Sequence, residues 1–374
     1  MKVLILGNLN SVHTVRWINA LNDEGLDVYA FGLSGADNRE IQIPIDKVRD
    51  AGIHECASCS TLTKIKYLSA LIKLKEFIRS CDPDILHAHF ASSYGLLGAL
   101  SGFHPYVVSV WGADVYNFPR NSFLNREVIK FILMQSDVIT STSKVMAIET
   151  RKYTKKQIHV VPFGVDTSIF KPTNVCSIFR EDEIVIGTIK ALEKKYGIDV
   201  LIKAFHILKT RLGNYPLKLL IVGGGSQESE LKNLVRVLGL ERDVVFTGKV
   251  RHSEVARYHN MITIFAALSI DESESFGVAV VEAMACGRPV VVSRVGGLPE
   301  VVEDGVTGFV VPPMNPEAAA SALQNLITNP ELRKKMGLKA LERVKSFYDW
   351  RSNVKMMIRI YESIYANRLN YLRS

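Results

Sequence analysis

Residues 274–292 read ESFGVAVVEAMACGRPVVV and contain the unit from which the fold is built. Within 278–286 every side chain except that of Glu282 is apolar. A helix that is apolar on all sides is buried, so the helix predicted here has no face toward solvent. Gly287 and the proline two residues later end this helix, and residues 289–292 then form a short apolar strand. A buried helix that leads directly into a buried strand indicates an α/β fold.

The same alternation of short apolar runs and helix-length segments extends along the chain. Helices are expected between the runs, for example over 11–24, 64–80 and 122–135. Alternating strands and helices predict parallel sheets with both faces covered, and two such series predict two doubly wound Rossmann-like domains. The predicted strands are 2–6, 27–31, 84–87, 106–110, 137–141 and 158–162 in the first series, and 184–189, 217–222, 243–246, 262–266, 289–292 and 308–311 in the second.

A chain of 374 residues is long for one core and suits two domains. The join is expected in VPFGVDTSIFKP, residues 161–172, where prolines and a glycine interrupt the pattern. We therefore predict a first domain over 1–165, a second over 166–347, and a C-terminal helical segment over 348–374. Ligands of such sheets bind beyond the carboxyl ends of the strands, so the site is expected in a cleft between the two domains.

The composition is that of an ordinary soluble globular protein, with 47% hydrophobic and 22% charged residues. The start of the chain, MKVLILGNL, is typical of a buried strand and turn and lacks the features of a secretory signal. The longest apolar run, MITIFAALSI, is too short for a membrane span. A cytoplasmic protein is therefore expected, and no recognised nucleic-acid motif accompanies the basic charge.

The net charge is +8, and basic residues cluster in the first half of the chain. One interpretation is that these residues cover solvated helix faces. The other is that they attract an anionic membrane surface or an acidic substrate. The clustered residues are Lys64, Lys66, Lys73, Lys75, Arg79, Arg151, Lys152, Lys155 and Lys156.

Metal-binding patterns are weak in this sequence. Cys56 and Cys59 form a lone C-x-x-C with His54 nearby, but a zinc site takes four ligands and no second pair follows. Free thiols are therefore favoured over a metal or redox site. Asp82 and Asp84 form a D-x-D that opens a strand and is better interpreted as a turn, so no metal is expected.

Two carboxylates stand at the ends of ESFGVAVVE. In a single helix, Glu274 and Glu282 would lie roughly 12 Å apart along the axis, too far to act together on one bond. We therefore expect them to contact different parts of one larger ligand. Glu282 is alone in a buried helix and needs hydrogen-bond partners, which are either protein donors or a ligand diol such as a ribose. Glu274 precedes the helix, where the amides of 275–277 favour oxygen acceptors.

Two further groups suit a diphosphate. Gly296 and Gly297 follow a predicted strand and would let main-chain amides approach a phosphate closely. The charges of Lys190 and Lys195, after another predicted strand, converge on a diphosphate or else belong to an exposed basic loop. The glycine run 223–225 lacks the G-x-G-x-x-G spacing, and tight backbone geometry explains it equally well.

Together, these motifs resemble the retaining glycosyltransferases of family 4, whose members have the two-domain GT-B fold. The resemblance extends over about residues 1–350 and is strongest at 272–312. It implies transfer of a sugar from a nucleoside diphosphate sugar, without a metal, and a C-terminal helix that returns to the first domain. The motifs that carry it are ESFGVAVVEAMACGRPVV, VGGLPEVV, GVTGFVVPP, VPFGVD and KALEKKYGID.

The resemblance also assigns roles on the donor side. Glu274 would bind hydroxyls of the transferred sugar, and Glu282 would bind the nucleotide ribose. Lys190 and Lys195 match a basic pair, usually arginine then lysine, that binds the leaving diphosphate. Lysine in the first place keeps the charge but lacks the bidentate guanidinium. The predicted donor-binding residues are Gly7, Phe276, Gly277, Glu282, Gly296, Gly297, Leu298 and Val250, and the predicted catalytic residues are Glu274, Lys190, Lys195 and Asp114.

The stretch VVSVWGADVY, residues 107–116, departs from the family pattern. Many relatives carry His-Gly-x-Asp here, with the histidine beside the reaction centre, whereas this chain has Trp111 before Asp114. A tryptophan cannot exchange protons, so the contribution of that histidine is absent or comes from elsewhere. His13 and His89 are the candidates, and with Trp111 they form the predicted acceptor side.

The implied chemistry is dissociative, so the protein's main task is to stabilise charge on the departing phosphates. The expected donor is a UDP- or GDP-sugar. The expected acceptor is a saccharide or lipid-linked saccharide of bacterial surface polysaccharide or lipopolysaccharide synthesis, used at the inner face of the plasma membrane. The alternatives are a nucleotide-sugar epimerase of the same fold and a non-catalytic sugar-nucleotide-binding relative, the latter suggested by Trp111.

Overall fold

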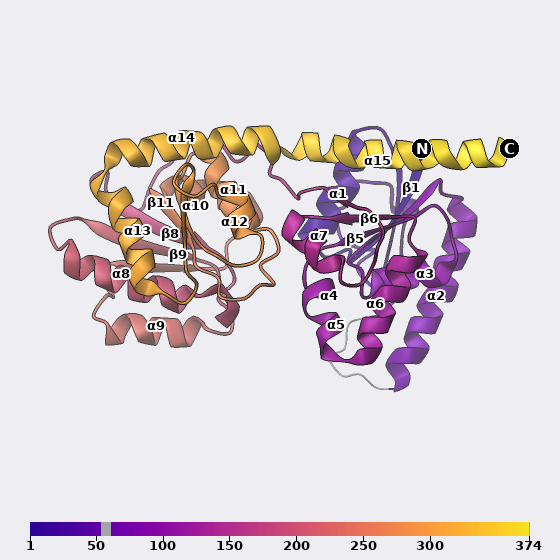
Figure 1. Cartoon of the computed structure of the whole chain (residues 1–374), viewed down its shortest axis with the longest axis horizontal. Coiled ribbons are helices and arrows are strands. Elements are labelled where there is room, and N and C mark those ends of the chain that lie inside the picture. Colours follow the sequence, from indigo (N-terminus) through magenta and orange to yellow (C-terminus); the bar gives the residue numbers. More distant parts are fainter. Residues whose placement is uncertain (54–60, 374) are drawn as a thin grey trace. The chain divides into compact units, whose positions relative to one another are not determined.

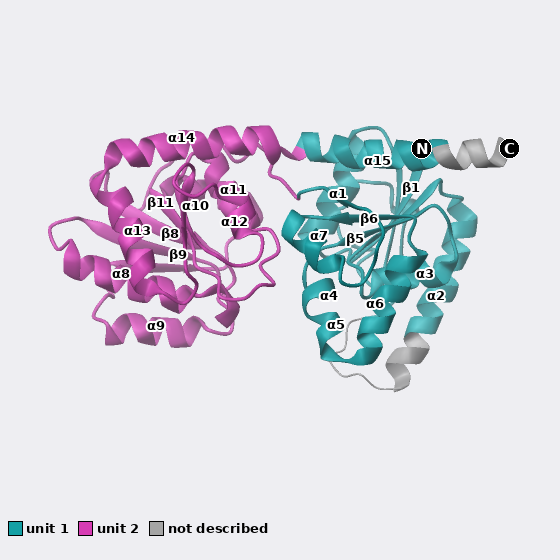
Figure 2. Ribbon diagram, in the orientation of Figure 1, with its two compact units in different colours: residues 1–162, 351–374 teal, residues 163–350 magenta. Residues whose placement is uncertain are grey.

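The computed structural model describes residues 1–53 and 61–373. The chain forms two compact units, which Figure 2 distinguishes by colour. Unit 1 comprises Met1–Pro162 and Arg351–Ser374, and unit 2 comprises Phe163–Trp350. The C-x-x-C pattern and its neighbouring histidine, singled out above, lie outside the described residues.

In the described part of unit 1, seven parallel strands form one sheet in the order β3-β2-β1-β4-β5-β6-β7. Figure 1 labels β1, β5 and β6 of this sheet. The order runs outward from β1 to β3 on one side and from β4 to β7 on the other. The sheet therefore has a topological switch point between β1 and β4. The strands are β1 Lys2–Leu6, β2 Asp27–Gly32, β3 Val48–Asp50, β4 Ile85–His89, β5 Tyr106–Val110, β6 Val138–Ser141 and β7 Ile158–Val160.

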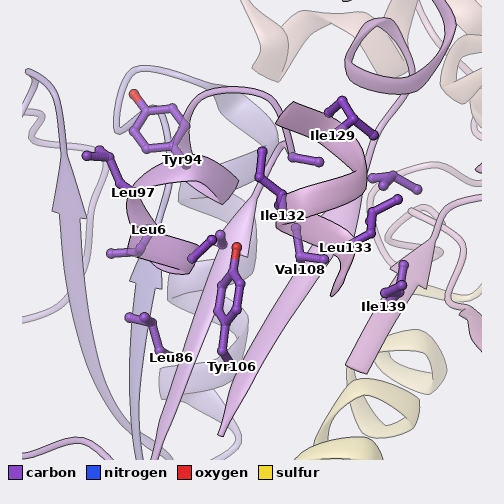
Figure 3. Close-up of a cluster of buried hydrophobic side chains, with 14 of the residues drawn as sticks. Leu6, Leu86, Tyr94, Leu97, Tyr106, Val108, Ile129, Ile132, Leu133 and Ile139 are labelled. Atoms are coloured by element: carbon purple, nitrogen blue, oxygen red, sulfur yellow. The ribbon is translucent and has the colours of Figure 1, made fainter. Parts of the chain in front are cut away.

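Helices of unit 1 bury apolar side chains against this sheet. Figure 3 shows side chains of α3 and α6 lying beside side chains of β1, β4 and β5 in one hydrophobic cluster. Gly98 keeps α3 close to β5, because a Cβ at this position would lie 2.5 Å from the ring of Tyr106. The helices are α1 Val12–Asp23, the 3-10 helix η1 Ile45–Lys47, α2 Thr61–Cys81, α3 Tyr94–Ser101, α4 Ala113–Tyr116, α5 Phe118–Asn121, α6 Phe123–Gln135, α7 Lys144–Thr150 and α15 Trp350–Arg373.

In the described part of unit 2, six parallel strands form a sheet in the order β10-β9-β8-β11-β12-β13, with a switch point between β8 and β11. A second hydrophobic core lies in this unit. The strands are β8 Ile184–Ile189, β9 Leu217–Val222, β10 Val244–Gly248, β11 Ile264–Ala267, β12 Val290–Ser293 and β13 Gly308–Val311. The helices are the 3-10 helix η2 Lys194–Tyr196, α8 Ile198–Arg211, α9 Glu228–Val237, α10 His252–Met261, α11 Val278–Ala285, α12 Leu298–Val301, α13 Pro316–Thr328 and α14 Pro330–Phe347.

The structure confirms the predicted α/β class with two parallel-sheet units. Each predicted strand is present within a few residues, and the apolar helix is α11, which starts after Gly277 at a φ of 89°. Strand β3, Val48–Asp50, was not predicted, because Val48 is the only apolar residue of its three. No helix in the described ranges is both long and apolar enough to cross a membrane.

A buried polar chain links α15 to the sheet of unit 1. His87 on β4 contacts the hydroxyl of Tyr361 through Nδ1 at 2.6 Å and the hydroxyl of Ser109 through Nε2 at 2.7 Å. Ser109 in turn contacts the hydroxyl of Thr140 on β6. All four side chains are buried. Burial lowers the pKa of His87 to about 3, so the ring is neutral and each nitrogen needs its own partner.

Replacement of Tyr361 by phenylalanine tests how strongly this contact holds α15. Tyr361→Phe leaves Nδ1 of His87 without a partner in a buried site, so the free energy of unfolding should fall by about 1–3 kcal/mol. Denaturant-induced unfolding measures this change. Tyr365→Phe on the same helix is the matched control, because Tyr365 is only half-buried. Equal stabilities of the two variants would contradict the prediction.

Candidate functional site

The switch point of unit 2 brings two predicted site residues together. Lys190 directly follows β8, and Glu274 lies in the loop after β11. Nζ of Lys190 lies 2.7 Å from Oε2 of Glu274, and the hydroxyl of Ser269 donates to the same oxygen at 3.2 Å. The lysine predicted to bind a diphosphate is therefore paired with the carboxylate predicted to bind sugar hydroxyls. An entering anion would compete with Glu274 for this lysine.

Tyr196 places a second lysine beside the first. Its ring lies 4.4 Å from Nζ of Lys190 and 4.9 Å from Nζ of Lys195, measured to the ring centroid. The face of an aromatic ring attracts cations, so the ring stabilises both ammonium groups near it. Sequence reasoning missed this role, although the aromatic residue adjoins the lysines in KKYG.

The turn that carries Tyr196 is closed by main-chain contacts. Residues 194–196 form η2, and Gly197 follows with a φ of 61°. A Cβ on Gly197 would lie 2.0 Å from the carbonyl oxygen of Leu268, so only glycine fits here. The amide of Ile270 donates to the carbonyl of Lys195 at 2.8 Å. These contacts hold the lysine turn against the loop after β11.

The carboxylate and one lysine of this group also share a small pocket with other predicted residues. Gly277 and Leu298 lie opposite each other there, because a Cβ on Gly277 would approach Cδ2 of Leu298 to 2.6 Å. The structure therefore brings part of the predicted donor side together within unit 2. The pocket is lined by Lys190, Tyr196, Ser269, Glu274, Gly277 and Leu298, among others.

Gly296 and Gly297 allow two loops to meet main chain to main chain. A Cβ on Gly296 would lie 2.0 Å from the carbonyl oxygen of Glu274, and one on Gly297 would lie 2.3 Å from that of Ser275. The amide of Gly297 donates to the carbonyl of Glu274 at 2.8 Å. The amide of Gly296 donates to the carboxylate of Glu272, also at 2.8 Å. The amides predicted to face a phosphate thus have acceptors within the protein.

The glycine run 223–225 has a similar explanation. A Cβ on Gly223 would lie 1.9 Å from the carbonyl oxygen of Lys190, and one on Gly225 would lie 2.6 Å from that of Leu192. The run therefore lets the loop after β9 lie against the segment that carries Lys190. Tight backbone geometry, the simpler of the two interpretations from the sequence, accounts for these glycines.

Two predicted donor-binding residues lie outside the lysine pocket. The side chain of Phe276 is buried and packs against the rings of Phe163 and Tyr348. Val250 is half-buried in the loop between β10 and α10. The side chains of Phe276 and Val250 therefore do not line the lysine pocket. Phe276 contributes only its main chain, which lies beside the start of α11.

Glu282 lies on α11 with a side chain that is 8% exposed. Its Oε2 accepts a hydrogen bond from Nε2 of His259 at 3.3 Å. His259 lies on α10 and is fully buried. The sequence left a protein donor and a ligand diol as alternatives for Glu282. The structure contains a protein donor, His259, and this donor contacts one of the two carboxylate oxygens of Glu282.

The switch point of unit 1 brings the predicted acceptor-side residues together. His89 ends β4, and its ring lies 4.7 Å from that of Trp111, with an interplanar angle of 36°. The ring of His13 lies 6.2 Å from that of Trp111, edge to face. Gly7 follows β1, where a Cβ would lie 3.4 Å from Cβ of His89. Burial, and secondarily the adjacent His87, holds the pKa of His89 well below its usual range.

Asp114 acts on the loop that carries Trp111. Its carboxylate is fully buried and accepts hydrogen bonds from the amides of Ala91 at 2.8 Å, Gly112 at 2.7 Å and Trp111 at 3.1 Å. Burial raises the pKa of Asp114, while these main-chain donors oppose the rise. In this structure Asp114 therefore shapes the turn, and its oxygens face main-chain amides.

No group of three or more His, Cys, Asp or Glu side chains in the described ranges is arranged to hold a metal ion. Within the D-x-D, Asp84 accepts a hydrogen bond from the amide of Lys2, at the start of β1, at 2.8 Å. Burial raises the pKa of the Cys81 thiol to about 11 and that of Cys286 to about 12.

The role of Tyr196 predicts a difference between two substitutions. Tyr196→Phe keeps the aromatic face and should bind inorganic pyrophosphate as the wild type does. Tyr196→Leu removes the face and should weaken pyrophosphate binding by about tenfold, since two cation–π contacts are lost. Isothermal titration measures both affinities. Equal affinities of the phenylalanine and leucine variants would show that the ring does not organise the lysines.

Comparison with known proteins adds independent information. Residues 2–143 match the family model described as Glycosyl transferase 4-like, and residues 176–343 match that of Glycosyl transferases group 1. N-acetyl-alpha-D-glucosaminyl L-malate synthase from Bacillus anthracis is 30% identical over 314 residues, which is 81% of this chain and 79% of that protein.

Two further similarities cover most of the chain. The GDP-mannose-dependent alpha-(1-6)-phosphatidylinositol monomannoside mannosyltransferase of Mycolicibacterium smegmatis is 29% identical over 75% of this chain and 76% of its own. The crystal structure of Anabaena HepE in complex with UDP has a TM-score of 0.79 and 18% identity, over 97% of this chain and all of that one. That likeness shows the GT-B fold. The chain belongs to the group 1 glycosyltransferases.

Proposed function

We propose that the protein transfers a sugar from a UDP- or GDP-sugar to a hydroxyl of its acceptor, with retention at the anomeric carbon. The observation that carries this proposal is the contact between Lys190 and Glu274 at the switch point of unit 2. It places a cation suited to a diphosphate next to a carboxylate suited to sugar hydroxyls. The names of relatives also support it, since one includes GDP-mannose and a solved structure holds UDP.

In this proposal the lysines act on the leaving group. The bond between the anomeric carbon and the diphosphate oxygen breaks, and the acceptor oxygen forms the new bond on the same face. The proton of the acceptor hydroxyl passes to an oxygen of the departing phosphate. Lys190 and Lys195 stabilise the charge that develops on the diphosphate, and Glu274 accepts hydrogen bonds from the sugar. No protein nucleophile, metal or cofactor takes part in the proposed step.

The acceptor side of unit 1 suits binding rather than proton transfer. Trp111 stands where many relatives have a histidine, and the buried ring of His89 is held neutral. We therefore assign Trp111 and His13 to contact the acceptor through their ring faces. No histidine is needed to take the proton of the acceptor hydroxyl, because an oxygen of the departing phosphate accepts it.

The proposed acceptor is a saccharide or lipid-linked saccharide of bacterial surface polysaccharide or lipopolysaccharide synthesis. A feature of unit 1 supports a cytoplasmic protein that binds the inner face of the plasma membrane. Phe123 and Leu124, at the start of α6, are 79% and 70% exposed. Phe123 lines an open pocket of about 510 Å³ together with Arg126, Arg120 and Lys152, and the last two are paired with Glu149. Exposed apolar side chains flanked by cations suit an anionic lipid surface.

A hydrolysis screen without acceptor tests the transferase proposal. The protein is incubated with UDP-, GDP- and ADP-sugars, and release of free nucleoside diphosphate is followed. Slow release is expected with one donor. It should fall at least tenfold in Glu274→Ala and in Lys195→Ala, because each variant loses a group that contacts the sugar or the leaving diphosphate.

The other outcomes of the screen identify the alternatives. Conversion of an intact nucleotide sugar without release would indicate an epimerase. Binding of a donor with no release, and no transfer to any saccharide tested, would indicate a non-catalytic relative and would contradict the proposal.

Vesicle sedimentation tests the membrane proposal. The wild type should bind vesicles of phosphatidylcholine with 30% phosphatidylglycerol, and binding should weaken as salt rises. Replacing both Phe123 and Leu124 by serine should lower binding at least tenfold. Leu338→Ser, which removes an exposed apolar side chain in unit 2, is the control. Equal binding by the double variant and the control would contradict the assignment of this surface.

A further inference from the structure

The carboxylate of Glu282 has one protein partner within the described ranges. Nε2 of His259 donates to Oε2 at 3.3 Å, and Oε1 makes no hydrogen bond with the described residues. A buried carboxylate is costly unless its oxygens are satisfied. One oxygen is therefore held by the protein, and the other retains its capacity to accept from a ligand.

The ring of His259 is fixed by packing. Its centroid lies 5.3 Å from that of Phe265 on β11 and 6.0 Å from that of Phe170, with interplanar angles of 44° and 72°. The side chain is fully buried on α10. Neither aromatic neighbour competes for its polar atoms. The orientation of Nε2 toward Glu282 is thus determined by apolar contacts on the rest of the ring.

The hydrogen-bonding state of the ring follows from its surroundings. Nε2 must carry the proton in order to donate to a carboxylate. Nδ1 is buried and has no hydrogen-bond partner among the described residues. The neutral ring with its proton on Nε2 is the form that leaves no buried N–H group unsatisfied. In that form Glu282 is the one polar partner of His259 among the residues that the structure describes.

We propose that His259 is a positioning residue that orients Glu282 toward the ribose hydroxyls of the donor. The inference rests on the proposed function, which assigns the ribose to Glu282. With Oε2 held by Nε2, the plane of the carboxylate is set and Oε1 faces the ligand. A partner that orients a ligating group in this way commonly determines how well that group binds. Without this contact the carboxylate can rotate away from the ligand.

Three variants separate positioning from packing. His259→Phe keeps an aromatic ring in the core but removes the donor. His259→Gln keeps an N–H donor near the position of Nε2. His252→Phe is the matched control, because His252 is an exposed histidine on the same helix that also neighbours Phe170. Thermal unfolding of each variant confirms that it is folded before binding is measured.

Binding to paired ligands tests the proposal. Isothermal titration is carried out with UDP and GDP and with their 2′,3′-dideoxy analogues, which lack the ribose hydroxyls. His259→Phe should weaken binding of the preferred nucleotide about tenfold and leave binding of its dideoxy analogue unchanged. His259→Gln should recover most of the loss. Equal weakening of both ligands, or no weakening of either, would overturn the positioning role.

The same titrations on Glu282→Gln separate the positioning role of His259 from the assignment of the ribose to Glu282. If Glu282→Gln discriminates between the two ligands and His259→Phe does not, the inference fails and the proposed function stands. If Glu282→Gln does not discriminate, the ribose assignment fails and the inference fails with it. The combined variant should bind no more weakly than Glu282→Gln alone, because His259 acts through that carboxylate.

Discussion

The candidate site depends on a close main-chain contact between two loops. The main chain at Gly296 and Gly297 lies directly against the loop that carries Glu274. A side chain on either glycine would overlap a carbonyl oxygen of that loop. The contact holds the segment after β12 against the segment after β11, and Glu274 is thereby kept beside Lys190. The lysine segment is held by a second set of glycine contacts. Charged side chains that meet at one point of the sheet are therefore positioned by main-chain packing.

The two glutamates of ESFGVAVVE have separate environments. Glu274 is paired with a lysine in the loop, and Glu282 is bonded to a buried histidine from α10. That the two carboxylates contact different parts of one ligand stays a prediction. Helix α11 begins between them, so Glu274 lies in the loop before the helix and Glu282 lies on the buried helix itself. On the acceptor side, Asp114 plays a comparable main-chain role by fixing the turn that presents Trp111.

The fold could be predicted because its strands are continuous apolar runs between helix-length segments, whereas β3 is too short to produce such a run. The site could be predicted only in part. Lys190, Tyr196 and Glu274 belong to local motifs, but the contact of His259 with Glu282 joins two different helices. His259 precedes Glu282 by 23 residues, and no helical or strand spacing relates them. The sequence shows glycines at 296 and 297, but it cannot show that protein acceptors already occupy their amides.

The central claim is that Glu274 binds the sugar and Glu282 the ribose of one donor. Calorimetric binding of the donor and of its nucleoside diphosphate product, compared between Glu274→Gln and Glu282→Gln, tests it most directly. Glu274→Gln should weaken binding of the nucleotide sugar but not of the nucleoside diphosphate, which no longer competes with a carboxylate for Lys190, whereas Glu282→Gln should weaken both about equally. If both variants weakened binding of the nucleotide sugar and of the nucleoside diphosphate by the same factor, the separate roles of the two carboxylates would be contradicted.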